Sequence, residues 1–118
     1  MDSQTRVQAM TAAIQQLINE AEGYVIFIDR QSPENYVQLN SDGELEVTSR
    51  NFRTSRLPRL TETQVTQLVA LGFSAEAHPN HRRQTELTDA AAIASMCEQL
   101  FSLLGSPPTF DLDTEAGV

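Results

Sequence analysis

The chain has 118 residues, of which 40% are hydrophobic and 20% are charged. This composition suffices for one domain with one apolar core and excludes wholesale disorder. The sequence has no apolar run near about 18 residues and no basic, apolar leader, so we expect neither a transmembrane helix nor a secretory signal. Its single cysteine excludes an intramolecular disulfide and a cysteine-rich zinc site. A cytoplasmic protein is the resulting expectation.

Charge is unevenly distributed along the chain. All eight basic residues are arginines, and sixteen residues are acidic, for a net charge of −8. Residues 50–83 contain six of the arginines and only two acidic residues, a local net charge of +4. Because an acidic protein repels nucleic acid and anionic lipid over most of its surface, we expect no nucleic-acid or membrane partner. The basic segment still allows local contact with an anionic partner.

The first predicted element is an amphipathic helix over residues 5–22. Thr5 and Gln8 have the spacing of a capping box, and Gly23 can end the helix. Apolar side chains recur at steps of three and four, which place them on one helical face: Val7, Met10, Ile14, Leu17, Ile18 and Ala21.

Three strands are predicted next. Residues 24–28 are apolar on both alternating faces, as is typical of an inner strand. Residues 36–39 and 44–48 alternate in polarity around the tight turn at 40–43, which predicts a hairpin. The result is a three-stranded meander.

The second half is predicted to contain two more helices and two more strands. After an arginine-bearing connection, Thr61 and Gln64 repeat the capping-box spacing at the start of a short helix that Gly72 ends. Alternation predicts a fourth strand at 73–78 and a fifth at 82–87. A last helix begins at Thr88-Asp89 and ends at Gly105.

The predicted fold is therefore α+β, an antiparallel sheet packed with helices in the order α-β-β-β-α-β-β-α. We expect one domain over residues 1–105 and a flexible acidic tail over residues 106–118, since Pro107 and Pro108 prevent the last helix from continuing.

Catalytic patterns are weak in this sequence. Cys97 lies on the apolar stripe of the last helix, where a buried and inert thiol is expected. His78 and His81 flank a Pro-Asn turn beside two arginines, and zinc needs at least three suitable ligands. The sequence has no glycine-rich phosphate loop and no pattern of nucleophile and base. We therefore predict no enzyme and no cofactor.

An alternative is calcium binding, because acidic and amide side chains cluster around the predicted hairpin: Asn40, Asp42, Glu44 and Glu46. Neither this cluster nor the alternating acids of the tail match the twelve-residue calcium loop. Calcium geometry is permissive, so a small acidic calcium-binding or sensor protein remains open as a second function.

A partner-binding surface is the main hypothesis. The inner strand is apolar on two faces, and three short helices offer limited cover, so Tyr24, Ile26 and Ile28 are candidate contacts for a client or a second subunit. Four arginines at intervals of three could rim that surface and favour an acidic partner: Arg50, Arg53, Arg56 and Arg59. The alternative is a solubilising loop that balances the protein's own acids.

Several short motifs, in order, resemble the secretion-chaperone-like domain known as TY-Chap. The resemblance covers roughly residues 3–104. Its motifs include the following: Asp42-Gly43, Asn51-Phe52, Leu60-Thr61 with Gln64, Leu71-Gly72-Phe73, Pro79-Asn80 and Arg83. Phe73 departs from the family, in which tryptophan is frequent there. A fainter similarity is to the small acidic calcium-binding proteins of cyanobacteria. The main resemblance implies a non-catalytic and often dimeric module that holds a client segment on an apolar sheet or groove.

Overall fold

The computed structural model describes residues 1–51 and 54–118. In this part of the chain, three helices and five strands form an α+β fold, which confirms the predicted class. The helices are α1 (Ser3–Glu20), α2 (Glu62–Ala70) and α3 (Ala90–Leu104). The strands are β1 (Tyr24–Asp29), β2 (Tyr36–Asn40), β3 (Glu44–Val47), β4 (His81–Gln84) and β5 (Leu112–Gly117). None of the helices in the described ranges is both long and apolar enough to cross a bilayer.

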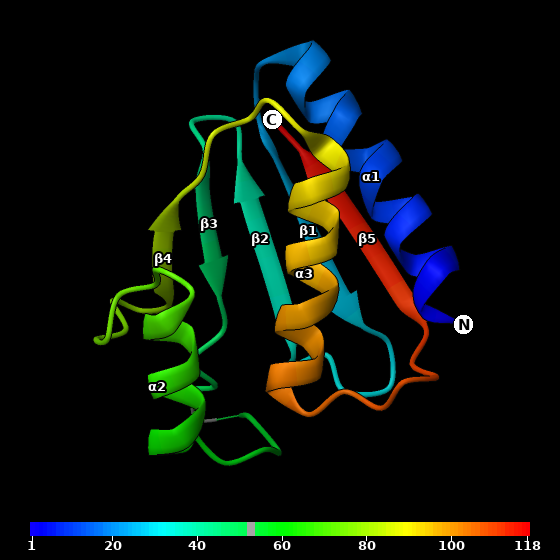
Figure 1. Ribbon diagram of the computed structural model, residues 1–118. Coiled ribbons are helices and arrows are strands. Elements are labelled where there is room, and N and C mark those ends of the chain that lie inside the picture. Colours follow the sequence, from blue (N-terminus) through cyan, green and yellow to red (C-terminus); the bar gives the residue numbers. More distant parts are fainter. Residues whose placement is uncertain (52–53) are drawn as a thin grey trace.

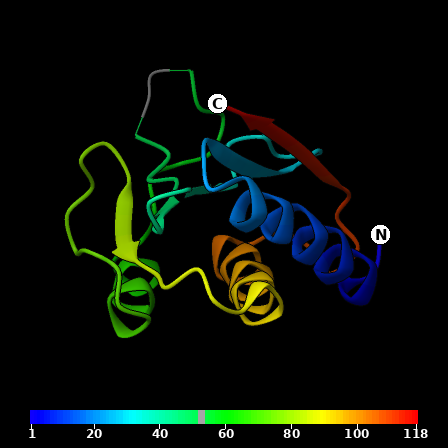
Figure 2. The ribbon, with the colours of Figure 1, turned by 90° about the horizontal axis from the view of Figure 1, so that it is seen from above.

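The strands form one antiparallel sheet in the order β4-β3-β2-β1-β5. All three helices lie on one side of this sheet (Figures 1 and 2). Alternate residues of the three central strands point toward the helices and form the strand side of the core: Val25, Phe27, Val37, Leu39, Leu45 and Val47. The sheet therefore has a helix-covered face and an open face.

The predicted capping box is present at the start of α2, whereas α1 begins with a different cap from the predicted one. Thr61 and Gln64 form the predicted capping box, with Thr61 N–H donating to Gln64 Oε1 at 2.8 Å and Gln64 N–H donating to Thr61 Oγ1 at 3.2 Å. At α1, Asp2 is the cap instead of Thr5, since its carboxylate accepts from Thr5 N–H at 2.7 Å. The helix consequently begins two residues earlier than predicted.

Residues 73–78 do not form the predicted fourth strand. Phe73 is buried directly after α2, but Ala75 is exposed, so the alternation of small apolar residues has no core to face. Ser74 makes a local contact with β4 instead, its N–H donating to Arg82 O at 2.8 Å. The predicted fifth strand corresponds to β4, which forms one of the two edges of the sheet.

The tail after α3 is also different from the prediction. Residues 112–117 form β5 and pair with the whole of β1, so this segment is not a flexible tail. The observed order is therefore α-β-β-β-α-β-α-β, with the last strand following the last helix. Phe110 and Leu112 are buried and anchor the segment, and the Phe110 ring lies 4.8 Å from that of Phe101 in α3.

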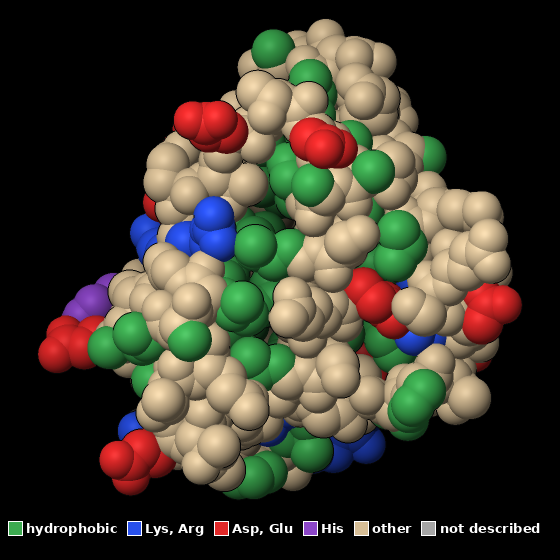
Figure 3. Space-filling view, viewed as in Figure 1, with side chains coloured by type: hydrophobic (Ala, Val, Ile, Leu, Met, Phe, Trp, Pro, Cys, Tyr) green, Lys and Arg blue, Asp and Glu red, His purple; other side chains and the backbone are tan. Residues whose placement is uncertain are grey.

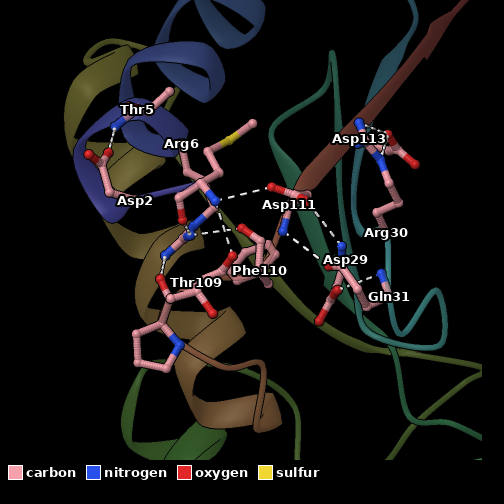
Figure 4. Close-up of polar contacts among 12 residues, drawn as sticks. Asp2, Thr5, Arg6, Asp29, Arg30, Gln31, Thr109, Phe110, Asp111 and Asp113 are labelled. Atoms are coloured by element: carbon pink, nitrogen blue, oxygen red, sulfur yellow. Dashed lines mark hydrogen bonds and ion pairs between the residues drawn. The ribbon is translucent and has the colours of Figure 1, made fainter.

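A buried arginine fixes the start of this segment. Arg6 of α1 is only 1% exposed and pairs with Glu98 of α3, with Nε 3.0 Å from Oε2. Its guanidinium also donates to the carbonyls of Pro108, at 3.0 Å, and Phe110, at 2.9 Å. The same group lies 4.0 Å from the centre of the Phe110 ring. Figure 4 shows Arg6 beside Phe110.

Replacing Phe110 by alanine should lower the free energy of unfolding by about 3 kcal/mol, because it removes a buried ring that both Arg6 and Phe101 contact. Thr109→Ala is the matched control, since its side chain is exposed and should matter little. Urea denaturation of the two variants measures the difference. Equal stability would mean that the segment contributes nothing to the core.

Candidate functional site

The open face of the sheet is built by the alternation along β1. Val25 and Phe27 point to the helices, which directs Tyr24, Ile26 and Ile28 to the opposite side. The structure thus brings these three predicted contact residues onto one uncovered face. They are half-buried there, because neighbouring strands shield them from the sides.

The sheet register sets the neighbours of this apolar row. Ile26 lies between Gln38 of β2 and Glu115 of β5. Tyr24 faces Gly117, where a Cβ atom would lie 2.6 Å from the tyrosine hydroxyl oxygen, so the ring occupies the space a side chain would need. At Tyr24 and Ile26 the apolar row is therefore one strand wide, with polar or small residues on both sides, and at Ile28 the neighbouring Tyr36 of β2 widens it.

The rim of the open face is acidic. On the β3–β4 side, Arg82 pairs with Glu44 at 3.3 Å and with Glu46 at 3.4 Å. On the β5 side, Arg30 pairs with Asp113 at 2.9 Å (Figure 4). Hydrogen bonding to Asp113, followed by its negative charge, raises the pKa of Arg30 above its usual value. These two guanidinium groups are paired with carboxylates, and the exposed Glu115 adds further negative charge.

Arg50 is not a surface contact, which corrects the prediction for this residue. Its side chain is buried, with Nε 3.0 Å from Asn35 Oδ1, and it also donates to the carbonyl of Leu104 at the end of α3. Burial lowers the pKa of the guanidinium. The residue adopts φ 55°, and its own N–H donates to Thr48 Oγ1 at 3.0 Å. Arg50 therefore connects β3 to α3 inside the fold.

The Arg50 contact continues as a buried chain of polar groups that sequence reasoning missed. Asn35 Nδ2 donates to Ser106 Oγ at 3.1 Å, and Ser106 Oγ donates to Asp29 Oδ2 at 2.7 Å. Asp29 also accepts from the backbone N–H of Gln31 at 3.0 Å. Asp29 follows Val25 and Phe27 at steps of two along β1, so the alternation of the strand indicates that its side chain points inward.

The other members of the arginine series are separated in space. Arg56 is exposed and lies 3.6 Å from Glu34 in the β1–β2 connection. Hydrogen bonds from the Glu34 backbone and then from the Arg56 backbone lower the pKa of Glu34, and the Arg56 charge adds to this effect. Arg59 is exposed beside a depression of about 340 Å³ that His81 also lines. Arg53 lies outside the described residues.

The predicted calcium ligands lie in the hairpin between β2 and β3. Glu44 and Glu46 share Arg82 as their ion partner, and Asn40 donates to Glu46 Oε2 at 3.1 Å. Asp42 Oδ1 accepts from Glu44 N–H at 2.9 Å. In residues 1–51 and 54–118, no three His, Cys, Asp or Glu side chains are grouped as metal ligands. Arg82 is thus already the positive partner of Glu44 and Glu46, the two carboxylates that a calcium ion would need.

The helix-covered face has a hollow of its own. Apolar side chains gather between α3 and the side formed by β4 and α2 (Figure 3), where Leu71 and Leu103 line one part and Ile93 and Met96 another. Arg83 lies in this region and donates to the carbonyl of Leu71 at 2.6 Å. Arg83 projects to the helix side of the sheet, so it adds no positive charge to the open face.

Arg50→Met should lower the free energy of unfolding by about 2 kcal/mol or more, because buried acceptors on Asn35 and Leu104 lose their charged donor. Arg59→Met removes the same charge from an exposed position and should change stability by less than about 0.5 kcal/mol. Thermal unfolding of both variants tests the assignment. Similar stabilities would contradict a structural role for Arg50.

Cys97 should be unreactive in the folded protein. It is fully buried in α3, and burial raises the pKa of its thiol to about 12. Because the thiolate is the reacting form, labelling by a thiol reagent should require unfolding. We expect labelling at neutral pH to be slow in buffer and fast in denaturant. Rapid labelling of the native protein would contradict the buried position.

Comparison of the chain with known protein families, with curated proteins and with solved structures gives no match. The resemblance to TY-Chap domains therefore remains a prediction from sequence motifs. A function for this chain has to be inferred from the chemistry of its surfaces.

Proposed function

We propose that the chain is a non-catalytic protein-binding module that holds a partner segment on the open face of its sheet. The observation that carries the proposal is the apolar row of Tyr24, Ile26 and Ile28 on the side away from all three helices. A second apolar layer would remove this row from water, which is the main source of affinity at protein interfaces.

The charges of the rim indicate the partner's chemistry. Among the described residues, Arg50 is buried, Arg56 is near Glu34 and Arg82 is paired twice, so this part of the chain does not present the continuous arginine rim expected for an acidic partner. Carboxylates flank the apolar row instead, with Glu115 exposed on its β5 side. A segment that combines apolar and basic side chains is complementary to this face.

The same rim argues for a client over a homodimer at this surface. Two copies would each bring a net charge of −8 and carboxylates on both sides of the apolar row. Repulsion between like charges opposes that contact, most strongly at low salt. We therefore expect a complex with a different protein, and we expect it to form best at low salt.

Two sequence hypotheses bear on this proposal. The TY-Chap resemblance favours client binding, and the first five elements follow the order that it implies. After them, the strand expected at 73–78 is absent and β5 follows the last helix. The calcium alternative has less support, because the carboxylates of Glu44 and Glu46 are compensated by Arg82. The buried Cys97 also argues against a thiol enzyme.

A site-specific photo-cross-linker tests the face directly. Placed at Gln38, next to Ile26 on the open face, it should capture a partner from a lysate of the source cells. The same cross-linker at Gln67, exposed on α2 on the helix side of the sheet, is the matched control and should not capture that partner. Capture only from Gln67, or from neither position, would count against the proposal.

The captured partner, once purified, allows a quantitative prediction. Ile26→Ser should weaken its binding by about tenfold or more, because a half-buried apolar contact worth roughly 1.5 kcal/mol is lost. Val69→Ser makes the same kind of change at an exposed position of α2 and should leave the Kd unchanged. Titration calorimetry measures both. An unchanged Kd for Ile26→Ser would exclude the apolar row as the binding surface.

A further inference from the structure

The outer edge of β5 has backbone groups that no strand of the described chain pairs with. Arg30 N–H donates to Asp111 O at 2.9 Å, and this pair continues the register of β1 and β5. Hydrogen-bonded and non-hydrogen-bonded pairs alternate in an antiparallel ladder. The residues of β5 that bond to β1 are therefore Asp113, Glu115 and Gly117, and those with N–H and C=O groups directed outward are Leu112, Thr114 and Ala116.

The two edges of the sheet differ in this respect. At β4, Ser74 covers the edge, because its N–H donates to Arg82 O at 2.8 Å and its Oγ accepts from Arg82 N–H at 3.1 Å. No comparable segment lies along β5 among residues 1–51 and 54–118: the turn and loop hydrogen bonds of this part of the chain do not involve residues 112, 114 or 116. β5 is therefore the edge at which a further strand can be added.

A groove accompanies this free edge. It has a volume of about 290 Å³ and lies between α1 and β5, where α1 runs along the strand on the helix side of the sheet (Figure 1). Ala13 and Leu17 line it from α1, and the small side chains of Thr114 and Ala116 line it from β5. The groove exists because α1 packs on α3 and β1, leaving Thr114 and Ala116 exposed.

The alternation of β5 gives its two sides different chemistry. Asp113 and Glu115 project to the open face, whereas Thr114 and Ala116 project to the groove. Glu20 adds a carboxylate at the end of α1 that borders the groove. A strand added beside β5 would therefore direct every second side chain toward the acidic open face and the others into the groove, over the small side chains of Thr114 and Ala116.

A second copy of the chain does not suit this edge. If two β5 strands paired antiparallel through residues 112, 114 and 116, each central register would set carboxylates directly opposite one another: Asp113 against Asp113, Asp113 against Glu115, or Glu115 against Glu115. Like charges directly opposite one another destabilise a strand pair. Arg30 pairs with Asp113, whereas no ion pair among the described residues involves Glu115, so the occupant is a different segment with a basic residue opposite Glu115.

We propose that the β5 edge binds an extended partner segment as a sixth strand, with a basic side chain beside Glu115 and apolar side chains in the α1–β5 groove. Main-chain hydrogen bonds to Leu112, Thr114 and Ala116 supply the docking geometry, and the alternating side chains supply specificity. This site adjoins the apolar row of the open face and shares Glu115 with its rim, but it is defined by the outward main-chain groups of β5 and does not depend on the function proposed for the row.

A short capped peptide of alternating lysine and valine residues is the probe. Amide hydrogen exchange, followed by NMR, should show fast exchange at Leu112, Thr114 and Ala116 in the free protein and slower exchange at Glu115. Adding the peptide should slow exchange at the three outward amides by about tenfold or more, because exchange then requires release of the bound strand. Slow exchange in the free protein, or no slowing with peptide, would overturn the proposal.

Peptide controls separate strand addition from charge attraction. The peptide methylated on the alternate backbone nitrogens that face β5 should lose the protection, whereas methylation of the other set should preserve it. A peptide of alternating glutamate and valine should not bind. If both methylated peptides bind equally, the contact is electrostatic only, and the sixth-strand geometry is wrong.

Two pairs of protein variants complete the test. Thr114→Pro removes an outward N–H that β1 does not use and should abolish binding, whereas Thr114→Val keeps that N–H and should bind. Glu115→Gln should weaken binding severalfold, and Glu86→Gln, with the same change in net charge at another exposed position, should not. Equal binding by both members of either pair would contradict the assigned contacts. If Thr114→Pro does not fold, the methylated peptides and the Glu115 pair still decide.

Discussion

The buried guanidinium of Arg6 is the constraint on which the position of the C-terminal strand, β5, depends. A charge with 1% exposure needs a full set of acceptors, and removing such partners from a buried ion costs about 3–5 kcal/mol. Glu98 supplies the opposite charge, and the carbonyls of Pro108 and Phe110 supply further acceptors. The chain leaving α3 must therefore pass across the start of α1, which brings residues 112–117 alongside β1.

A second buried polar group fixes the other side of the same turn. Ser106 follows the glycine that ends α3, and its hydroxyl bonds to Asp29 at the end of β1. Asn35 and Arg50 extend this contact to the β1–β2 connection and to the end of β3. These hydrogen bonds hold together the ends of strands and helices that are distant in sequence. They are buried, and leaving a buried polar group unpaired is costly.

The parts of the fold that were predictable are those determined by local periodicity. The apolar steps of α1 and the alternation around the hairpin required no knowledge of distant residues. The strand expected at 73–78 failed because Phe73 is its one large buried residue, and small alanines do not supply enough apolar area to hold a strand. β5 was missed because its sequence is polar and small, and its position is set by Arg6. That arginine was detectable: it precedes Met10 by four residues on the buried face of α1.

The candidate surfaces illustrate why arginine spacing alone could not locate the site. Arg50 and Arg59 belong to the same series of arginines spaced three residues apart. Arg50 nevertheless completes a buried network and Arg59 is exposed, and only their contacts in the folded chain distinguish them. The acidic residues prove more informative, because strand alternation fixes their direction. On β5 they oppose self-pairing at an otherwise unprotected edge, a recognised means of avoiding aggregation. In the proposed complex the exposed Glu115 attracts a basic residue, so the acidic strand that opposes self-pairing also selects the partner.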